Sequence, residues 1–222
     1  MFKLYPIKPK ILSCKIVPAM NAALAKSLIG PNIKYNNGHC SIGLITCDQD
    51  DSLYAALDHA TKFAKVEVIY AKSFYAGSAH ASGPLSGEIL GVIAAEDPDH
   101  IKAGLAALRN ALLEEISFYG IEGREGLSFF PHVIPSIGHY LAAQSGLPLG
   151  SALAYLIAPP IESVIALDHA LKSANVTLVK YFGPPTETNF GGAYLTGEID
   201  AVEAAARAFT EAIAEVHRHP LL

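Results

Sequence analysis

One five-residue run, Ala-Leu-Asp-His-Ala, occurs twice in this chain, at residues 56–60 and at residues 166–170. The two runs are 110 positions apart in a chain of 222 residues, and matching residues continue downstream at the same offset, with Lys62 opposite Lys172. A repeat whose period is half the chain length indicates two copies of one structural module. Two joined copies form a pseudo-symmetric building block, which favours assembly over catalysis.

The same order of elements is predicted in both copies. The first copy is expected to contain strands at 43–46, 66–70 and 89–95, helices at about 52–64 and from Asp97 to about Phe118, and a loop at 76–87. The second copy is expected to contain strands at 154–158, 176–182 and 193–196, helices at 160–173 and from Asp200 to about 216, and a loop at 183–189. The expected N-caps are Asp50 or Asp51, Asp97 and Asp200.

A short apolar string ending in proline stands before each copy, at residues 15–18 and 132–135, and a helical stretch follows each string. Strands and helices therefore alternate through the whole chain, which predicts an α/β (α+β) fold. We expect two domains, residues 1–118 and 119–222, each close to the usual domain size.

Composition favours an oligomer and excludes some partners. Hydrophobic residues make up 51% of the chain and charged residues 17%, but no apolar run reaches the roughly 18 residues of a membrane span. Surplus apolar surface on such a protein is usually buried against other subunits. The net charge is −5 and no segment concentrates Lys or Arg, so we expect neither nucleic acid nor membrane as a partner.

The cysteines and the N-terminus predict a cytoplasmic protein. Cys14, Cys40 and Cys47 form no CxxC pair, and their odd number fits a reducing compartment. The first six residues, Met-Phe-Lys-Leu-Tyr-Pro, lack the apolar segment of a secretory signal.

An acidic cluster is the strongest candidate for a binding site. Asp48, Asp50, Asp51 and Glu88, with the aromatic Phe118, are suited to hold a small ammonium ion. The alternative is that one aspartate caps a helix and the other carboxylates are simply solvated.

No catalytic residue is predicted, and we expect the protein not to be an enzyme. The Asp58-His59 and Asp168-His169 pairs resemble catalytic dyads, but adjacent residues on a helix point about 100° apart. Their repetition instead favours a structural role in each module. His80, in the Gly-rich loop, could surround a symmetry axis in an oligomer and bind Zn²⁺, although an exposed loop histidine is the simpler interpretation.

Two segments of the second copy, residues 167–179 and 195–205, resemble the core of a bacterial microcompartment (BMC) shell domain. The string His-Val-Ile-Pro precedes its copy here, as it does in the circularly permuted tandem members of that family. Residues 73–80, 155–160 and 184–190 are similar to the ethanolamine-utilization type. The resemblance implies two tandem, ferredoxin-like, circularly permuted BMC domains in a trimer with pseudo-hexameric symmetry.

The resemblance also implies a function and its residues. The protein is expected to be a structural shell protein whose trimers tile, with a gated central pore for metabolite or cofactor transport. Lys62 and Lys172 match the lysine at the tile edge. A smaller pore is expected to bind an ethanolamine-like ligand through Asp50, Glu88, Phe118 and Thr188, together with Asp48 of the acidic cluster. The gating loops, about 72–83 and 183–189, contain Phe74, Tyr75, Ala76, Gly77, Ser78, His80, Pro185, Thr186, Glu187 and Asn189.

The partners implied are further copies in a homotrimer, other shell proteins, and small amine or aldehyde metabolites, at the microcompartment shell. No cofactor is required, although family members make cobalamin or Zn binding possible. The alternative function is a soluble small-molecule sensor that does not tile. Alanine in place of Lys62 or Lys172 would leave the assembly of such a sensor unchanged.

Overall fold

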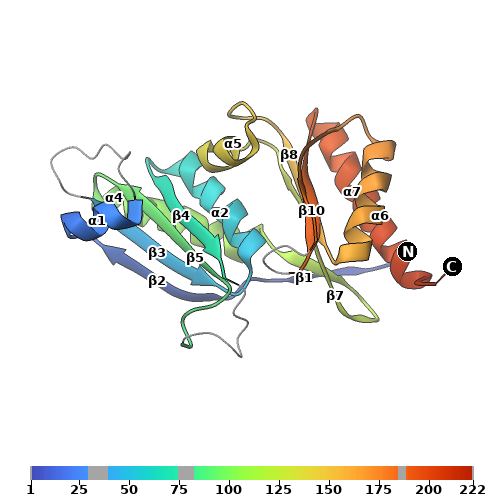
Figure 1. Cartoon of the computed structure of the whole chain (residues 1–222), viewed down its shortest axis with the longest axis horizontal. Helices are drawn as coiled ribbons and strands as arrows, with labels where there is room; N and C mark the ends of the chain where they lie inside the picture. The colour runs from blue at the N-terminus through green and yellow to red at the C-terminus, as the bar shows by residue number, and fades with distance from the viewer. Residues whose placement is uncertain (1, 30–39, 75–82, 185–188, 222) are drawn as a thin grey trace. The chain divides into compact units, whose positions relative to one another are not determined.

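The structure is a computed structural model of the whole chain, and it describes residues 2–29, 40–74, 83–184 and 189–221 (Figure 1). The chain forms two compact units. We call residues 9–116 with 138–141 the first-copy unit, and residues 1–8, 117–137 and 142–222 the second-copy unit. The N-terminal residues thus belong with the second copy, and four residues from the middle of the chain belong with the first. The predicted division into domains at residue 118 stays a prediction.

The first-copy unit is an antiparallel sheet with two helices, α2 and α4, that pack against each other and against its strands. The sheet has the order β2-β3-β5-β4. Met20 and Ala25, before and within α1, form a separate small core with Ile42, Val92 and Ala94 of the sheet. The elements of this unit are β2 (Ile11–Val17), α1 (Ala22–Ile29), β3 (Ser41–Cys47), α2 (Asp50–Phe63), β4 (Glu67–Ser73), β5 (Ile89–Ala95) and α4 (Pro98–Glu114).

The second-copy unit is a six-stranded antiparallel sheet of order β1-β6-β7-β8-β10-β9, with α6 and α7 packed on it. Its core joins Phe129, Leu156 and Leu195 of the sheet to Leu167 and Phe209 of the helices. Its elements are β1 (Leu4–Ile7), β6 (Phe118–Ile121), β7 (Arg124–Ile134), β8 (Leu153–Ala158), α6 (Pro160–Ser173), β9 (Thr177–Phe182), β10 (Gly191–Thr196) and α7 (Ile199–Arg218). Helix α5 (His139–Ser145) begins in the first-copy unit and ends in this one.

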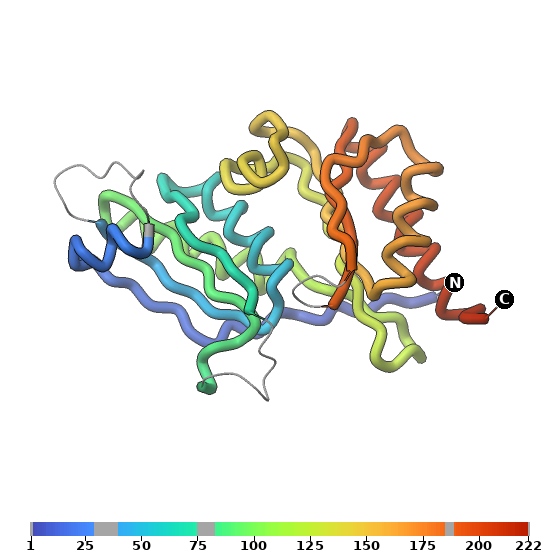
Figure 2. The backbone as a smooth tube through the Cα atoms, viewed as in Figure 1, coloured from blue at the N-terminus to red at the C-terminus, as the bar shows by residue number. Residues whose placement is uncertain are grey.

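The predicted repeat is confirmed as a repeat of topology. The orders β2-β3-β5-β4 and β7-β8-β10-β9 are the same arrangement. One helix follows each of β3 and β8, and another follows each of β5 and β10; Figure 1 labels these elements, and Figure 2 traces the chain through them. Helices α2 and α6 begin and end 110 positions apart. The helices that follow the two proline strings, α1 and α5, both begin four residues after the proline.

Two of the three predicted helix caps are wrong. Asp97 is confirmed, since its side chain accepts a hydrogen bond from the Asp99 N–H at 2.7 Å. Helix α2, however, is preceded by Gln49 as N-cap, and Asp50 and Asp51 are its first two residues. Helix α7 already starts at Ile199, so Asp200 lies in its first turn, where a carboxylate still complements the helix dipole.

Residues 118–134 form a β-hairpin that was not predicted, since the preceding helix was expected to extend to about Phe118. Helix α4 ends at Glu114, and the backbone enters β6 at Phe118. Ile121 pairs with Arg124 across a two-residue turn in which Gly123 has a φ of 77°. Glycine adopts that left-handed conformation without steric cost, so the Glu-Gly dipeptide was the available signal. Within the described residues, no helix combines the length and apolar character needed to cross a bilayer.

Candidate functional site

Two of the predicted carboxylates, Asp48 and Glu88, lie at the same end of the first-copy sheet. The Glu88 N–H donates a hydrogen bond to the carbonyl oxygen of Cys47 at 2.8 Å, one residue beyond the β3–β5 ladder. Asp48 follows Cys47 directly, and its Oδ1 accepts from the Lys10 N–H at 2.6 Å. The end of β3 therefore brings Asp48 of the β3–α2 connection and Glu88, which precedes β5, to neighbouring positions of the backbone.

Gly87 allows this close approach. Its φ is 62°, and a Cβ atom on it would stand 2.3 Å from the Cys47 carbonyl oxygen, far inside van der Waals contact. Only glycine fits both the backbone conformation and the space. Gly87 is a site-forming residue that the sequence analysis did not single out.

Asp50 lies two residues further along, in the first turn of α2, and it is buried. Its Oδ1 accepts a hydrogen bond from the Asp51 N–H at 2.8 Å. A buried carboxylate at a helix N-terminus is stabilised by the helix dipole. Asp50 thus serves the helix terminus without being its N-cap, and ammonium binding by the acidic cluster stays a prediction.

Glu88 differs from its neighbours in having a buried oxygen, Oε2, with no hydrogen-bond partner in the described part of the chain. An unpartnered carboxylate oxygen is costly unless a ligand or water meets it. The Glu88 carbonyl oxygen also accepts from the Phe74 N–H at 3.0 Å and from the Ser73 hydroxyl at 3.2 Å. Glu88 is therefore bonded to the point where the first predicted gating loop leaves β4.

Phe118 belongs to the second-copy unit, where it lies in a cluster of aromatic rings. Its ring centroid is 5.0 Å from that of Phe130 and 6.1 Å from that of Phe190. Phe190 follows Asn189, which has a φ of 63°. The structure thus places Phe118 beside the end of the second predicted gating loop.

Several predicted site residues lie outside the described residues. This is the case for Thr188 of the predicted small pore, and for eight gating-loop residues: Tyr75, Ala76, Gly77, Ser78, His80, Pro185, Thr186 and Glu187.

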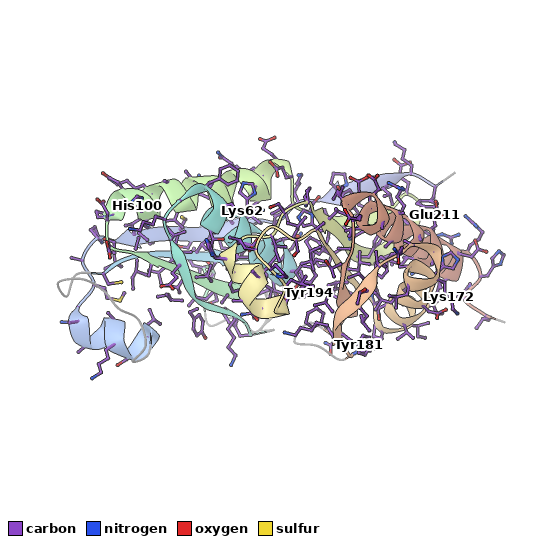
Figure 3. All side chains as sticks on the ribbon, turned by 90° about the horizontal axis from the view of Figure 1, so that it is seen from above. Lys62, His100, Lys172, Tyr181, Tyr194 and Glu211 are labelled. Carbon is purple, nitrogen blue, oxygen red and sulfur yellow. The ribbon has the colours of Figure 1, made fainter. Side chains whose placement is uncertain are left out.

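The two predicted edge lysines occupy equivalent helix positions but different environments (Figure 3). Lys62 on α2 lies 3.8 Å from Asp58 Oδ2, and a quarter of its side chain is exposed. Lys172 on α6 lies 2.7 Å from Asp168 Oδ2 and is largely exposed.

The two Asp-His pairs also differ between the copies. The carboxylate of Asp58 is fully buried and accepts hydrogen bonds from the Gly138 N–H at 2.7 Å and the Leu141 N–H at 2.8 Å. Thr61 Oγ1 accepts a third, from the His139 N–H, at 3.0 Å. Asp58 is thus the cap of α5 rather than half of a catalytic dyad. The sequence held one sign of this role: Gly138, directly before α5, has no side chain to cap the helix, so the cap had to come from another segment.

The thiol at this end of the sheet is poorly suited to act as a nucleophile. Burial raises the pKa of the Cys47 thiol to about 12, so this group stays protonated at neutral pH. Over the described ranges, no group of three or more His, Cys, Asp or Glu side chains is placed to hold a metal ion. The predicted zinc residue, His80, is not among the residues in those ranges.

Comparison with known proteins places the chain in a family. The BMC domain family model matches residues 41–121 and 158–221, once in each copy. EutL shell proteins of Clostridium perfringens and Salmonella typhimurium are 42% and 40% identical to this chain, and each alignment covers 97% of the chain and at least 96% of the relative. The structure of EutL from Leptotrichia buccalis matches with a TM-score of 0.90 at 44% identity over 99% of both chains. The trimeric shell protein PduB shares the fold at a TM-score of 0.74 and 18% identity.

The duplicated α+β module is that of the tandem BMC-domain proteins. The chain belongs to the bacterial microcompartment shell protein family, a family of structural proteins, and within it to the EutL type.

Proposed function

We propose that this protein is a trimeric tile of an ethanolamine-utilization microcompartment shell, with pseudo-hexameric symmetry and a gated central pore. The observation that carries the proposal is the duplication of the shell domain within one chain, in the same topology along the full length of the EutL relatives. Three such chains supply six modules, the number that closes a hexagonal ring. The other shell proteins are the remaining partners of the tile.

The contacts of Glu88 support a link between ligand binding and the pore. A small amine that pairs with the buried Glu88 oxygen would act on a residue whose carbonyl holds Ser73 and Phe74. A ligand shifts a two-state loop only by its different affinity for the two states. The amine would therefore favour the state in which Ser73 and Phe74 keep their hydrogen bonds to the Glu88 carbonyl and the Glu88 carboxylate meets the ammonium group.

Sedimentation equilibrium with negative-stain imaging tests the tile. Three chains of 23.5 kDa give a particle of about 70 kDa, and flat hexagonally packed sheets are expected in the images. A monomer or dimer at all concentrations would contradict the proposal and favour the non-tiling sensor.

Calorimetric titration with ethanolamine tests the ligand. We expect saturable binding to the wild type and at least a tenfold loss in Glu88→Gln, because the neutral amide removes the charge that pairs with an ammonium group. Glu122→Gln changes an exposed carboxylate of the second-copy unit and is the control. Equal affinity in the wild type and both variants would contradict a role for Glu88, while the tile would stand.

A further inference from the structure

The repeat exposes a difference between two equivalent helix faces. We call Ile161, Val164, Ile165 and Asp168 the α6 face; their equivalents on α2, 110 positions earlier, are Asp51, Tyr54, Ala55 and Asp58. On α2, Asp51, Ala55 and Asp58 are all buried, whereas Ile161, Val164 and Ile165 are 68%, 51% and 46% exposed. The carboxylate of Asp168 is 62% exposed. One copy therefore has a covered face and the other an uncovered apolar face around an aspartate.

Residues 138–141 of the same chain are part of what covers the α2 face. Asp58 accepts the Gly138 and Leu141 N–H groups, and the rings of Tyr54 and Tyr140 lie 6.4 Å apart. Leu141 is fully buried. The covering segment is the start of the helix that follows the second proline string.

The equivalent of this covering segment is uncovered too. Counting from the two prolines, Pro18 and Pro135, Leu141 corresponds to Leu24 in the first turn of α1. Leu24 is 56% exposed. In the first copy, the α2 face is in contact with residues 138–141. The repeats of these two partners, the α6 face and the start of α1, are both uncovered in the single chain.

We propose that the α6 face binds the start of α1, with Leu24 as its apolar anchor, from a second copy of this chain. One residue of the face, Ile165, also lines a hollow of about 430 Å³ between α6 and α7. Asp168, which pairs with Lys172 in the single chain, is the repeat of the Asp58 carboxylate that receives the start of α5. Such a contact is heterologous, and repeated head to tail it closes a ring when its rotation is that of the proposed trimer.

The substitutions between the copies fit this pairing. Gly138 has no side chain with which to cap α5, so Asp58 supplies the cap. The equivalent of Gly138 is Asn21, which caps α1 itself and accepts from the Ala23 and Leu24 N–H groups at 3.0 and 3.3 Å. The acceptor Thr61 is correspondingly replaced by Leu171. A Cβ atom on Gly138 would lie 2.4 Å from Thr61 Oγ1, so a residue with a side chain does not fit at position 138 beside Thr61. With Leu171 in place of Thr61, the contact between copies is expected to be more apolar than its counterpart.

Crosslinking between chains tests this pairing, which rests on the proposed trimer. Ala23 and Val164 are the equivalents of Tyr140 and Tyr54, so a chain with Ala23→Cys is mixed with a differently tagged chain with Val164→Cys and treated with a short bis-maleimide. We expect a crosslinked dimer carrying both tags. The control pairs Ala23→Cys with Leu113→Cys, a helical leucine as exposed as Leu24 at 56%.

Sedimentation of Leu24→Asp gives an independent readout. Because a charge replaces the apolar anchor, we expect the dissociation constant of the assembly to rise at least about thirtyfold, with the circular dichroism spectrum unchanged. Leu113→Asp is the control. If the wild type is a trimer but neither crosslinking nor Leu24→Asp differs from its control, the pairing is wrong and the tile stands. If the wild type never assembles, the tile and the pairing both fail.

Discussion

At the scale of single residues, repetition in the sequence does not guarantee repetition of environment. Asp58 and Asp168 occupy the same position of the same five-residue run. Asp58 is buried and holds two backbone N–H groups, whereas Asp168 forms an exposed ion pair with Lys172. The surrounding elements, rather than the run itself, decide what each carboxylate does.

Asp58→Ala is expected to lower the free energy of unfolding by about 2–4 kcal/mol, because it leaves two buried N–H groups without an acceptor. Asp168→Ala removes an exposed pair and is expected to change it by less than about 0.5 kcal/mol. Urea denaturation, at concentrations below those at which the chains assemble, measures both. Equal losses in the two variants would contradict the distinct roles.

His59 gives the stability a pH dependence with a defined sign. Burial lowers its pKa below 6.5, and the nearby Lys62 ammonium acts in the same direction. The unfolded chain then takes up the proton more readily, so the contribution of His59 is fully present above the unfolded pKa and is lost as the pH falls through the folded pKa. Urea midpoints measured from pH 7.5 to 5.5 should decrease, and less so in His59→Gln. Parallel slopes in wild type and variant would remove His59 as the cause.

At the scale of elements, helix and strand patterns were predicted well and connections poorly. The expected strands and helices of both copies are present, because their apolar residues recur at the periods of a sheet face and a helix face. The hairpin of β6 and β7 was missed, and so was β1, which pairs with β6. A four-residue strand such as β1 carries little periodic signal, and its partner is more than a hundred residues away.

The connection before β5 depends on Gly87. Gly87→Ala forces a side chain into a left-handed conformation and against the Cys47 carbonyl, so we expect a loss of about 2 kcal/mol or more in the free energy of unfolding. Gly83→Ala is the control, since a Cβ atom there meets nothing within 4 Å. The two variants are compared by urea denaturation. A Gly87→Ala protein as stable as Gly83→Ala would show that this end of the sheet adapts freely.

At the scale of the whole molecule, the apolar surface of the second copy is the feature that needs other chains. Exposed apolar side chains gather on α6, and β9, the next element in the chain, exposes Leu178 and Tyr181. The composition had already predicted an oligomer, since half the residues are hydrophobic. The structure adds where that surplus lies.

Tiling of finished trimers is expected to depend on Lys172. Lys172→Ala should leave the trimer mass unchanged but reduce the hexagonal sheets seen by negative stain, because the long exposed side chain no longer reaches a neighbouring tile. Lys102→Ala removes an exposed lysine with a similar helical ion pair and is the control. Sheets equally abundant in both variants would remove Lys172 from the tile edge.

The sequence by itself determined the duplication, the α+β class and the family, because each depends on local patterns and on strings of adjacent residues. Asp97 as a helix cap also depended only on neighbours in the chain. The tertiary structure alone decided that Asp58 caps a helix eighty residues away, that Gly87 brings Glu88 to the end of β3, and that residues 1–8 belong with the second copy. These are contacts between distant segments, and their free energy comes from burial and hydrogen bonds that exist only once the chain has folded.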